Sequence, residues 1–174
     1  MISRLSNGIA GYLKKQEPEN TPSIAVMAYS LYIIIHESIT ILFIIIASLL
    51  LGSFVVTLYT LLYFMILRFF AGGYHLHSSK LCTVLSVLLI CGAPLIQLPL
   101  GWLPYLISIN LLFILIYAPR NIRGYARIPE KYYIYMKVVS LAVVASNFYW
   151  LDSSLVLVSL FHAILLVPKE KGGE

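Results

Sequence analysis

Residues 68–82 read RFFAGGYHLHSSKLC and form a polar interruption between two long apolar segments. This stretch contains two of the chain's four histidines and one of its two cysteines. The apolar residues after Cys82 predict a buried helix, and Ser78 and Ser79 are suited to its N-cap. The sequence therefore predicts a loop that leads into a helix, with Cys82 in the first turn of that helix or just beyond it.

The thiol of Cys82 is a candidate nucleophile. A thiol attacks as the thiolate, which needs a nearby base or a local positive potential, and a helix N-terminus provides such a potential. On one continuous helix His75 and Cys82 would be separated by about 10 Å along the axis, which is too far for proton transfer. We therefore expect a non-helical chain near His75, with Gly72 and Gly73 allowing the chain to turn.

The composition predicts an integral membrane protein. The chain has 174 residues, of which 60% are hydrophobic and 11% charged, and its mean hydropathy is +0.91. These values lie outside the range of soluble globular proteins. No internal repeat or second domain is visible, so we expect a single membrane-embedded domain over residues 1–174. Cys82 and Cys91 are expected to be free thiols, because one would face the loop while the other lies within an apolar segment.

The apolar segments predict the number of membrane spans. Residues 1–16 lack the apolar core of a secretory signal, and their apolar residues repeat at helical spacing, which indicates an interfacial amphipathic helix. After a Pro-rich connection come six segments long enough to span or nearly span a bilayer. We therefore expect an all-α polytopic membrane protein with six transmembrane helices. The segments lie at residues 27–51, 53–70, 81–100, 102–118, 132–151 and 153–168.

The positive charges predict the orientation. If the six segments span the bilayer, all twelve Lys and Arg residues lie on the side of the two termini, and Asp152 alone lies on the other. The positive-inside rule then places both termini, the loop of residues 68–82 and a basic loop of residues 119–131 in the cytoplasm of a multi-pass cell-membrane protein. The twelve residues are Arg4, Lys14, Lys15, Arg68, Lys80, Arg120, Arg123, Arg127, Lys131, Lys137, Lys169 and Lys171.

The polar stretch also carries a family resemblance. Arg68, Gly72, Gly73, His75 and Cys82, in this order and spacing between hydrophobic segments, resemble the catalytic loop of the accessory gene regulator B family. The resemblance implies a membrane cysteine endopeptidase that processes a quorum-sensing propeptide, without a cofactor. It also implies that His75 and Cys82 form the catalytic pair.

Several neighbouring residues have more than one interpretation. His77 competes with His75 as the base, and a His-x-His pair near a cysteine is also a metal-binding pattern, but no further ligand is close in the sequence. We favour His75 as the base, no metal, and a substrate-binding role for His77. Arg68 either holds the loop through hydrogen bonds or meets carboxylates of the substrate. Cys91 and His162 are expected to be structural.

Two other polar features are candidates for supporting roles. His36 and Glu37 lie within the first apolar segment, where ionisable groups indicate function. Glu37 either orients the catalytic imidazole or pairs with a neighbour in helix packing. The basic loop carries Arg120, Arg123 and Arg127 between aromatic residues, which is typical of contact with anionic lipid, or of nucleic-acid binding, which we do not expect here.

The resemblance implies a particular substrate and reaction. The expected partner is a short propeptide with an amphipathic leader and an acidic C-terminal tail, which the basic loop would attract. A thioester on Cys82 would keep the energy needed to close a thiolactone or lactone ring. The resemblance also implies a homodimer. The alternative is a small polytopic transporter or scaffold, in which the His/Cys loop acts as a metal or substrate gate.

Overall fold

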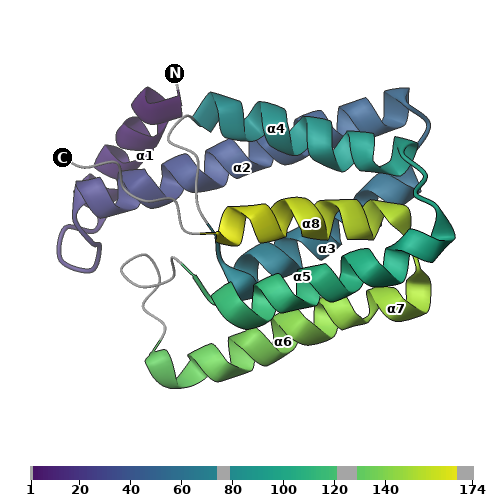
Figure 1. Ribbon diagram of the computed structural model, residues 1–174. Helices are drawn as coiled ribbons and strands as arrows, with labels where there is room; N and C mark the ends of the chain where they lie inside the picture. Colours follow the sequence, from purple (N-terminus) through teal and green to yellow (C-terminus); the bar gives the residue numbers. More distant parts are fainter. Residues whose placement is uncertain (1, 74–78, 121–128, 168–174) are drawn as a thin grey trace, which may run out of the picture. The chain divides into compact units, whose positions relative to one another are not determined.

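The computed structural model describes residues 2–73, 79–120 and 129–167, which form helices joined by turns (Figure 1). Within these ranges there is no β-strand, and one isolated parallel β-bridge joins Gly72 to Arg120. The predicted all-α class is therefore confirmed. The chain divides into two compact units, Met1–Ile46 and Ala47–Glu174.

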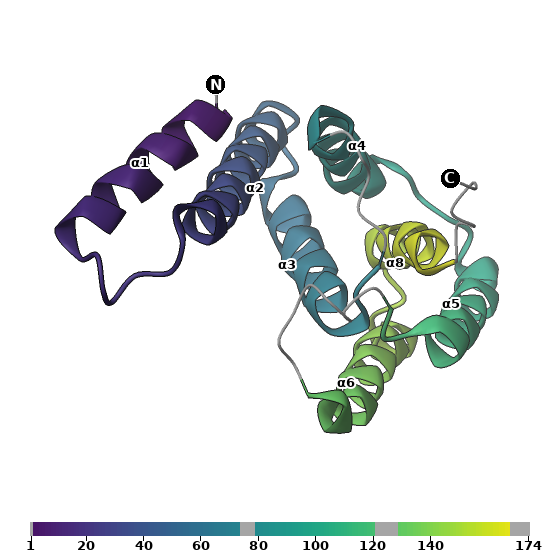
Figure 2. The same cartoon turned by 90° about the vertical axis from the view of Figure 1, so that its left-hand side faces the viewer.

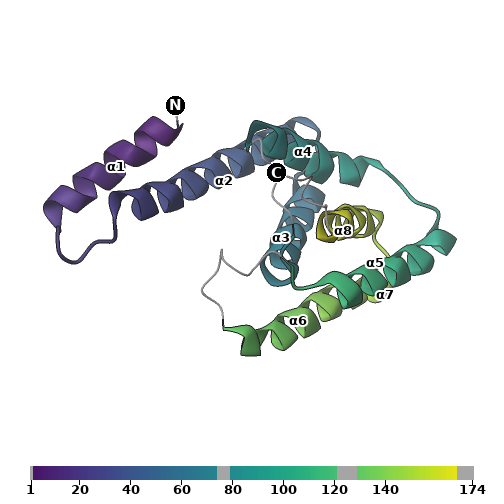
Figure 3. The ribbon, with the colours of Figure 1, turned by 60° about the vertical axis from the view of Figure 1, so that its left-hand side comes forward.

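The first unit contains the helix predicted at the N-terminus. Helix α1 (Ile2–Gln16) leaves several of its apolar side chains exposed, and α2 (Ile24–Leu50) follows it (Figure 3). The Lys14 ammonium donates hydrogen bonds to the carbonyls of Pro18 (2.6 Å) and Thr21 (2.7 Å). These two bonds hold the Pro-containing connection that follows α1.

The second unit contains the remaining helices. They are α3 (Phe54–Ala71), α4 (Ser79–Gly92), α5 (Leu103–Tyr117), α6 (Tyr133–Ala145), α7 (Asn147–Trp150) and α8 (Ser153–Leu166). Short 3-10 turns lie at Ala93–Leu95, Leu100–Trp102 and Glu130–Tyr132. Each of the six apolar segments expected from the sequence therefore contains a helix.

Helices α3, α5, α6 and α8 of the second unit form a bundle. Helix α8 packs against α3 and α5, and α6 closes the ring because it contacts the same two helices. Figure 2 shows α8 nearly end-on, with α3 and α5 on either side. Eight residues of α8 are buried, from Ser154 near its start to Leu166 at its end. Helix α8 is therefore buried along most of its length within the bundle.

The bundle core contains polar side chains that bridge helices. Asn110 of α5 donates a hydrogen bond of 2.8 Å to the hydroxyl of Ser159 of α8, and both side chains are fully buried. Asn147 donates a hydrogen bond of the same length to the hydroxyl of Tyr63 in α3. Interhelical hydrogen bonds of this kind join helices in lipid, where the hydrophobic effect contributes little to packing.

Among the described residues, three helices are long and apolar enough to cross a membrane: Ile24–Leu50, Phe54–Ala71 and Leu100–Tyr117. The apolar helices Lys80–Leu95 and Ser153–Leu166 are shorter. A helix of fourteen residues is about 21 Å long, against a hydrocarbon layer of about 30 Å. Length and composition therefore show a membrane protein, and the count of six spans stays a prediction.

Lys137 has a partner within the protein. A lysine within an apolar segment either extends its ammonium to the membrane surface or lies before the span. Helix α6 includes it, and its ammonium donates a hydrogen bond of 2.9 Å to the carbonyl of Leu115 in the last turn of α5. Carbonyls in the last turn of a helix have no partner within that helix, so a cation is favourable there.

Asp152 fixes the start of α8. Its Oδ1 accepts hydrogen bonds from the N–H groups of Ser154 (2.8 Å) and Leu155 (3.1 Å), and its Oδ2 accepts one from the Tyr59 hydroxyl (2.9 Å). Asp152→Ala should therefore destabilise the protein by about 1 kcal/mol, the usual value of an N-cap. Thermal unfolding in detergent measures this. Asp152→Ser keeps a capping oxygen and should lose less, so equal losses in the two variants would contradict the capping role.

Candidate active site

The glycine pair forms the turn predicted from the sequence. Helix α3 ends at Ala71, and Gly72 and Gly73 follow with φ angles of +74° and +124°. Residues other than glycine rarely adopt φ angles in this region, because their Cβ atom then crowds the backbone. The chain therefore leaves the helical path at these two residues, as the argument about proton transfer requires.

The glycine turn is joined to the start of the basic loop. The N–H of Arg120 donates to the carbonyl of Ala71, and the N–H of Gly73 donates to the carbonyl of Arg120, both at 3.0 Å. These bonds form the parallel bridge between Gly72 and Arg120. The polar stretch and the start of the basic loop, which are far apart in the sequence, are therefore hydrogen-bonded to each other.

Arg68 lies against the same turn. Its Nη1 atom is buried and lies 3.1 Å from the place that a Cβ atom on Gly73 would occupy. The guanidinium therefore packs against the glycine backbone from within the last turn of α3. The two interpretations of Arg68, holding the loop through hydrogen bonds or meeting substrate carboxylates, both stay predictions.

His162 contacts the turn from the opposite helix. This residue of α8 is fully buried, and its Nε2 lies 3.0 Å from the carbonyl oxygen of Gly72. Its neighbour Leu165 lies beside Gly73, since a Cβ atom there would be 3.6 Å from the Leu165 carbonyl oxygen. The sequence indicated only a structural role for His162 and did not indicate this contact. The rule that singled out His36 and Glu37, an ionisable side chain within an apolar helix, applies equally to His162.

Cys82 lies where the sequence placed it. Helix α4 begins at Ser79, so Cys82 is its fourth residue and lies in the first turn. Its side chain is half-buried, whereas that of Cys91 in the same helix is buried, and neither cysteine forms a disulfide. Free backbone N–H groups at a helix start favour an anion, which suits a thiolate and an oxyanion formed beside it.

Several predicted site residues lie outside the described residues: His75, His77, Ser78, Arg123 and Arg127. The approach of His75 to Cys82, the role of His77, the Ser78 cap and a metal bound by the His-x-His pair therefore stay predictions. The chain length limits how far His75 can lie from the start of α4. Four residues separate the Cα atoms of His75 and Ser79 by at most about 14 Å.

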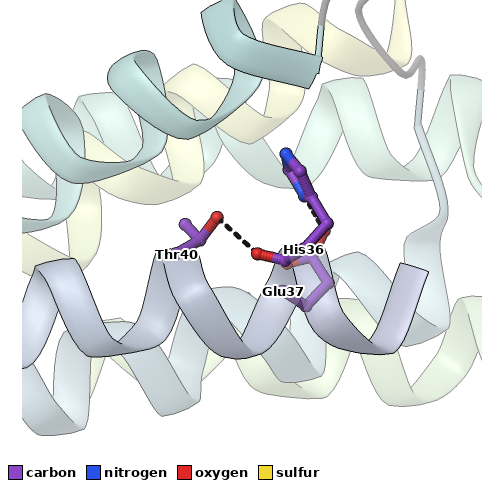
Figure 4. A network of polar contacts seen from close by, with 3 residues as sticks. All are labelled: His36, Glu37 and Thr40. Carbon is purple, nitrogen blue, oxygen red and sulfur yellow. Dashed lines mark hydrogen bonds and ion pairs between the residues drawn. The ribbon is translucent and has the colours of Figure 1, made fainter. Parts of the chain in front are cut away.

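Glu37 lies in the first unit, where it pairs with its neighbour. Its Oε1 is 3.6 Å from His36 Nδ1, an ion pair only when the imidazole is protonated, and the Glu37 side chain is 56% exposed. The Thr40 hydroxyl donates a hydrogen bond of 3.0 Å to the His36 carbonyl (Figure 4). These contacts fit the helix-packing interpretation, while a part in catalysis stays a prediction.

The apolar helices and the thiol at a helix start define a membrane protein with a candidate nucleophile in the first turn of α4 and a glycine turn at the end of α3. The chain belongs to the accessory gene regulator B family, because the family model, described as "Accessory gene regulator B", matches residues 6–168. The predicted resemblance is therefore confirmed.

A curated relative carries a matching name. A protein of Halalkalibacterium halodurans, described as AgrB-like, is 33% identical over 105 residues. The matched part covers 60% of this chain and 50% of the relative, so the chain spans about half the length of that relative. No solved structure matches the chain.

Proposed function

We propose that this chain is a membrane cysteine endopeptidase that removes the C-terminal part of a short autoinducer propeptide. Family membership supports a role in autoinducer processing. One structural observation supports the chemistry. A fixed glycine turn ends at Gly73, Cys82 lies in the first turn of α4, and the short connection between them contains His75.

The proposed reaction begins with proton transfer from Cys82 to His75. The thiolate forms a bond to the scissile carbonyl carbon, and N–H groups at the start of α4 stabilise the oxyanion. When the C–N bond breaks, the imidazolium of His75 gives its proton to the leaving amine. The C-terminal fragment departs, and the N-terminal fragment remains on Cys82 as a thioester.

A thioester retains enough energy for a second acyl transfer. A thiol or hydroxyl within the bound peptide attacks the thioester carbonyl, closes a thiolactone or lactone ring, and returns the Cys82 thiol. Exclusion of water at the membrane boundary favours ring closure over hydrolysis. The reaction needs neither an oxidant nor a cofactor.

The basic loop is proposed to attract the acidic tail of the propeptide. Arg120 is hydrogen-bonded to the glycine turn through its backbone, so the loop of residues 119–131 starts next to the turn that leads into the proposed catalytic loop. Cationic groups there increase the local concentration of an acidic peptide and contact anionic lipid. Arg123 and Arg127 are proposed to share this role, while His77, Ser78 and Ser79 are proposed to support substrate binding and the start of α4.

The proposed arrangement in the membrane follows the positive charges. We place six spans in the bilayer as one domain, with both termini, the catalytic loop and the basic loop in the cytoplasm. Helix α1 lies on the membrane surface, where its exposed apolar side chains contact lipid. A homodimer is part of the same proposal.

An acyl-enzyme trap tests this function. The chain is co-expressed with the short peptide that the family leads us to expect from a neighbouring reading frame, amphipathic first and acidic last. A thioester of the N-terminal fragment should then appear on Cys82 by mass spectrometry. Hydroxylamine should remove the fragment, because it cleaves thioesters but not amides. If the peptide remains whole, or crosses the membrane uncleaved, the transporter or scaffold alternative replaces the peptidase.

A further inference from the structure

The peptide unit between Gly72 and Gly73 is held at both of its polar atoms. Its carbonyl oxygen belongs to Gly72 and lies 3.0 Å from His162 Nε2. Its N–H belongs to Gly73 and donates to the Arg120 carbonyl at 3.0 Å. Both flanking residues have positive φ angles and carry no side chain. Glycine backbone rotates easily, so the direction of the chain beyond Gly73 depends on these two bonds.

The His162 ring is suited to this contact. A carbonyl oxygen accepts but does not donate, so Nε2 carries the hydrogen and donates it to Gly72. The ring is fully buried, and its edge meets the Phe64 ring at a centroid distance of 6.1 Å. Among the described residues, Nδ1 is buried without a hydrogen-bond partner. The hydrogen bond to Gly72 therefore fixes the orientation of the ring.

Helix α8 provides the rigid support that such a contact needs. It packs against both α3 and α5, and Leu165, three residues after His162, packs beside Gly73. The hydrogen bond thus joins α8 to Gly72, the residue that follows the end of α3. His75 lies only two residues beyond Gly73.

We propose that His162 is a positioning residue for the catalytic loop. Through the Gly72 carbonyl it sets the direction in which the chain leaves α3, and therefore where the His75 imidazole lies relative to Cys82. This inference rests on the proposed roles of His75 and Cys82. Without the donor, the Gly72 carbonyl is a partly buried acceptor that has lost its hydrogen bond, and the glycine peptide turns toward another partner.

The effect should appear in the rate of acylation rather than in peptide binding. A displacement of about 1 Å in a reacting group costs about 100-fold in rate. His162→Phe keeps a ring against Phe64 but removes the donor, so kcat for acylation by the neighbour-encoded peptide should fall about 100-fold with little change in KM. His162→Gln restores an N–H near the place of Nε2 and should recover most of the rate.

Ser159→Ala is the matched control. Ser159 is a fully buried residue of the same helix and bonds to Asn110, not to the glycine turn. This variant reports the cost of disturbing the α8 core and should keep the wild-type rate per folded molecule. Equal kcat losses in Ser159→Ala and His162→Phe, or no recovery in His162→Gln, would overturn the positioning role.

A second measurement does not need the peptidase reaction. In a Cys91→Ala background, His75→Cys places a second thiol on the loop, and its disulfide with Cys82 under copper–phenanthroline reports how often the loop approaches α4. Adding His162→Phe should slow this disulfide about 10-fold or more, since the loop then samples other directions. An unchanged disulfide rate overturns the inference. If His162→Phe slows the disulfide but the wild-type chain forms no acyl-enzyme, the positioning role is kept and the proposed function is rejected.

Discussion

Cys82→Ala is expected to abolish cleavage of the propeptide and formation of the thioester. Without the sulfur no acyl-enzyme can form, and removal of a catalytic nucleophile typically lowers the rate by a thousandfold or more, up to about 10⁶. The protein should remain folded, because the side chain is small and half-buried in the first turn of α4. Mass spectrometry of the peptide in cells that express the variant measures the loss.

Cys91→Ala is the matched control for this experiment. Cys91 lies in the same helix and is 5% exposed, so its replacement removes the other thiol of the chain without touching the start of α4. Cleavage should continue at close to the wild-type rate. His75→Ala should resemble Cys82→Ala, since the thiol then lacks its base. Complete cleavage by Cys82→Ala would exclude a cysteine mechanism.

The turn at the end of α3 could be predicted because its cause is local. Adjacent glycines after an apolar helix favour left-handed φ angles, and Gly72 and Gly73 adopt them. The start of α4 at Ser79 was predictable for a similar reason, since serines before an apolar run favour a helix start. Both features depend on residues close together in the chain.

The groups that hold the turn could not be predicted in the same way. The carbonyl of Gly72 meets His162, ninety residues later, and the N–H of Gly73 meets the backbone of Arg120. Neither contact follows from periodicity or spacing, because both depend on how α8 packs against α3 and α5. The sequence indicated only a structural role for His162 and pointed to no partner for it.

The number of spans shows a different limit. Hydropathy places apolar segments well, yet it does not show where the helices within them stop. Residues 132–151 contain a break at Ser146 between α6 and α7, where the Ser146 hydroxyl donates to the Val143 carbonyl at 2.7 Å. Side-chain bonds of this kind compete with the helical ladder. The apolar segment was therefore easier to predict than the length of continuous helix within it.

Gly73→Ala should lower the rate of cleavage about 100-fold, although Gly73 takes no part in the proposed chemistry. An alanine at φ +124° is strained by about 1–3 kcal/mol. Its Cβ would also lie 3.1 Å from the buried Nη1 atom of Arg68, closer than ordinary contact allows. The turn has to shift, and a shift of about 1 Å at the start of the catalytic loop lowers the rate about 100-fold.

Gly92→Ala separates this local effect from a general intolerance of alanine. Gly92 ends α4, and no heavy atom lies within 4 Å of the Cβ it would gain. The Gly92 φ of −83° suits an alanine, so this variant should unfold at an unchanged or slightly higher temperature and cleave normally. In Gly73→Ala, the rate of cleavage should fall strongly while the unfolding temperature falls only modestly, because the strain acts at Gly73, two residues before His75, rather than in the bundle core. A Gly73→Ala variant that cleaves at the wild-type rate would show that the direction of the chain at this turn does not control the catalytic pair.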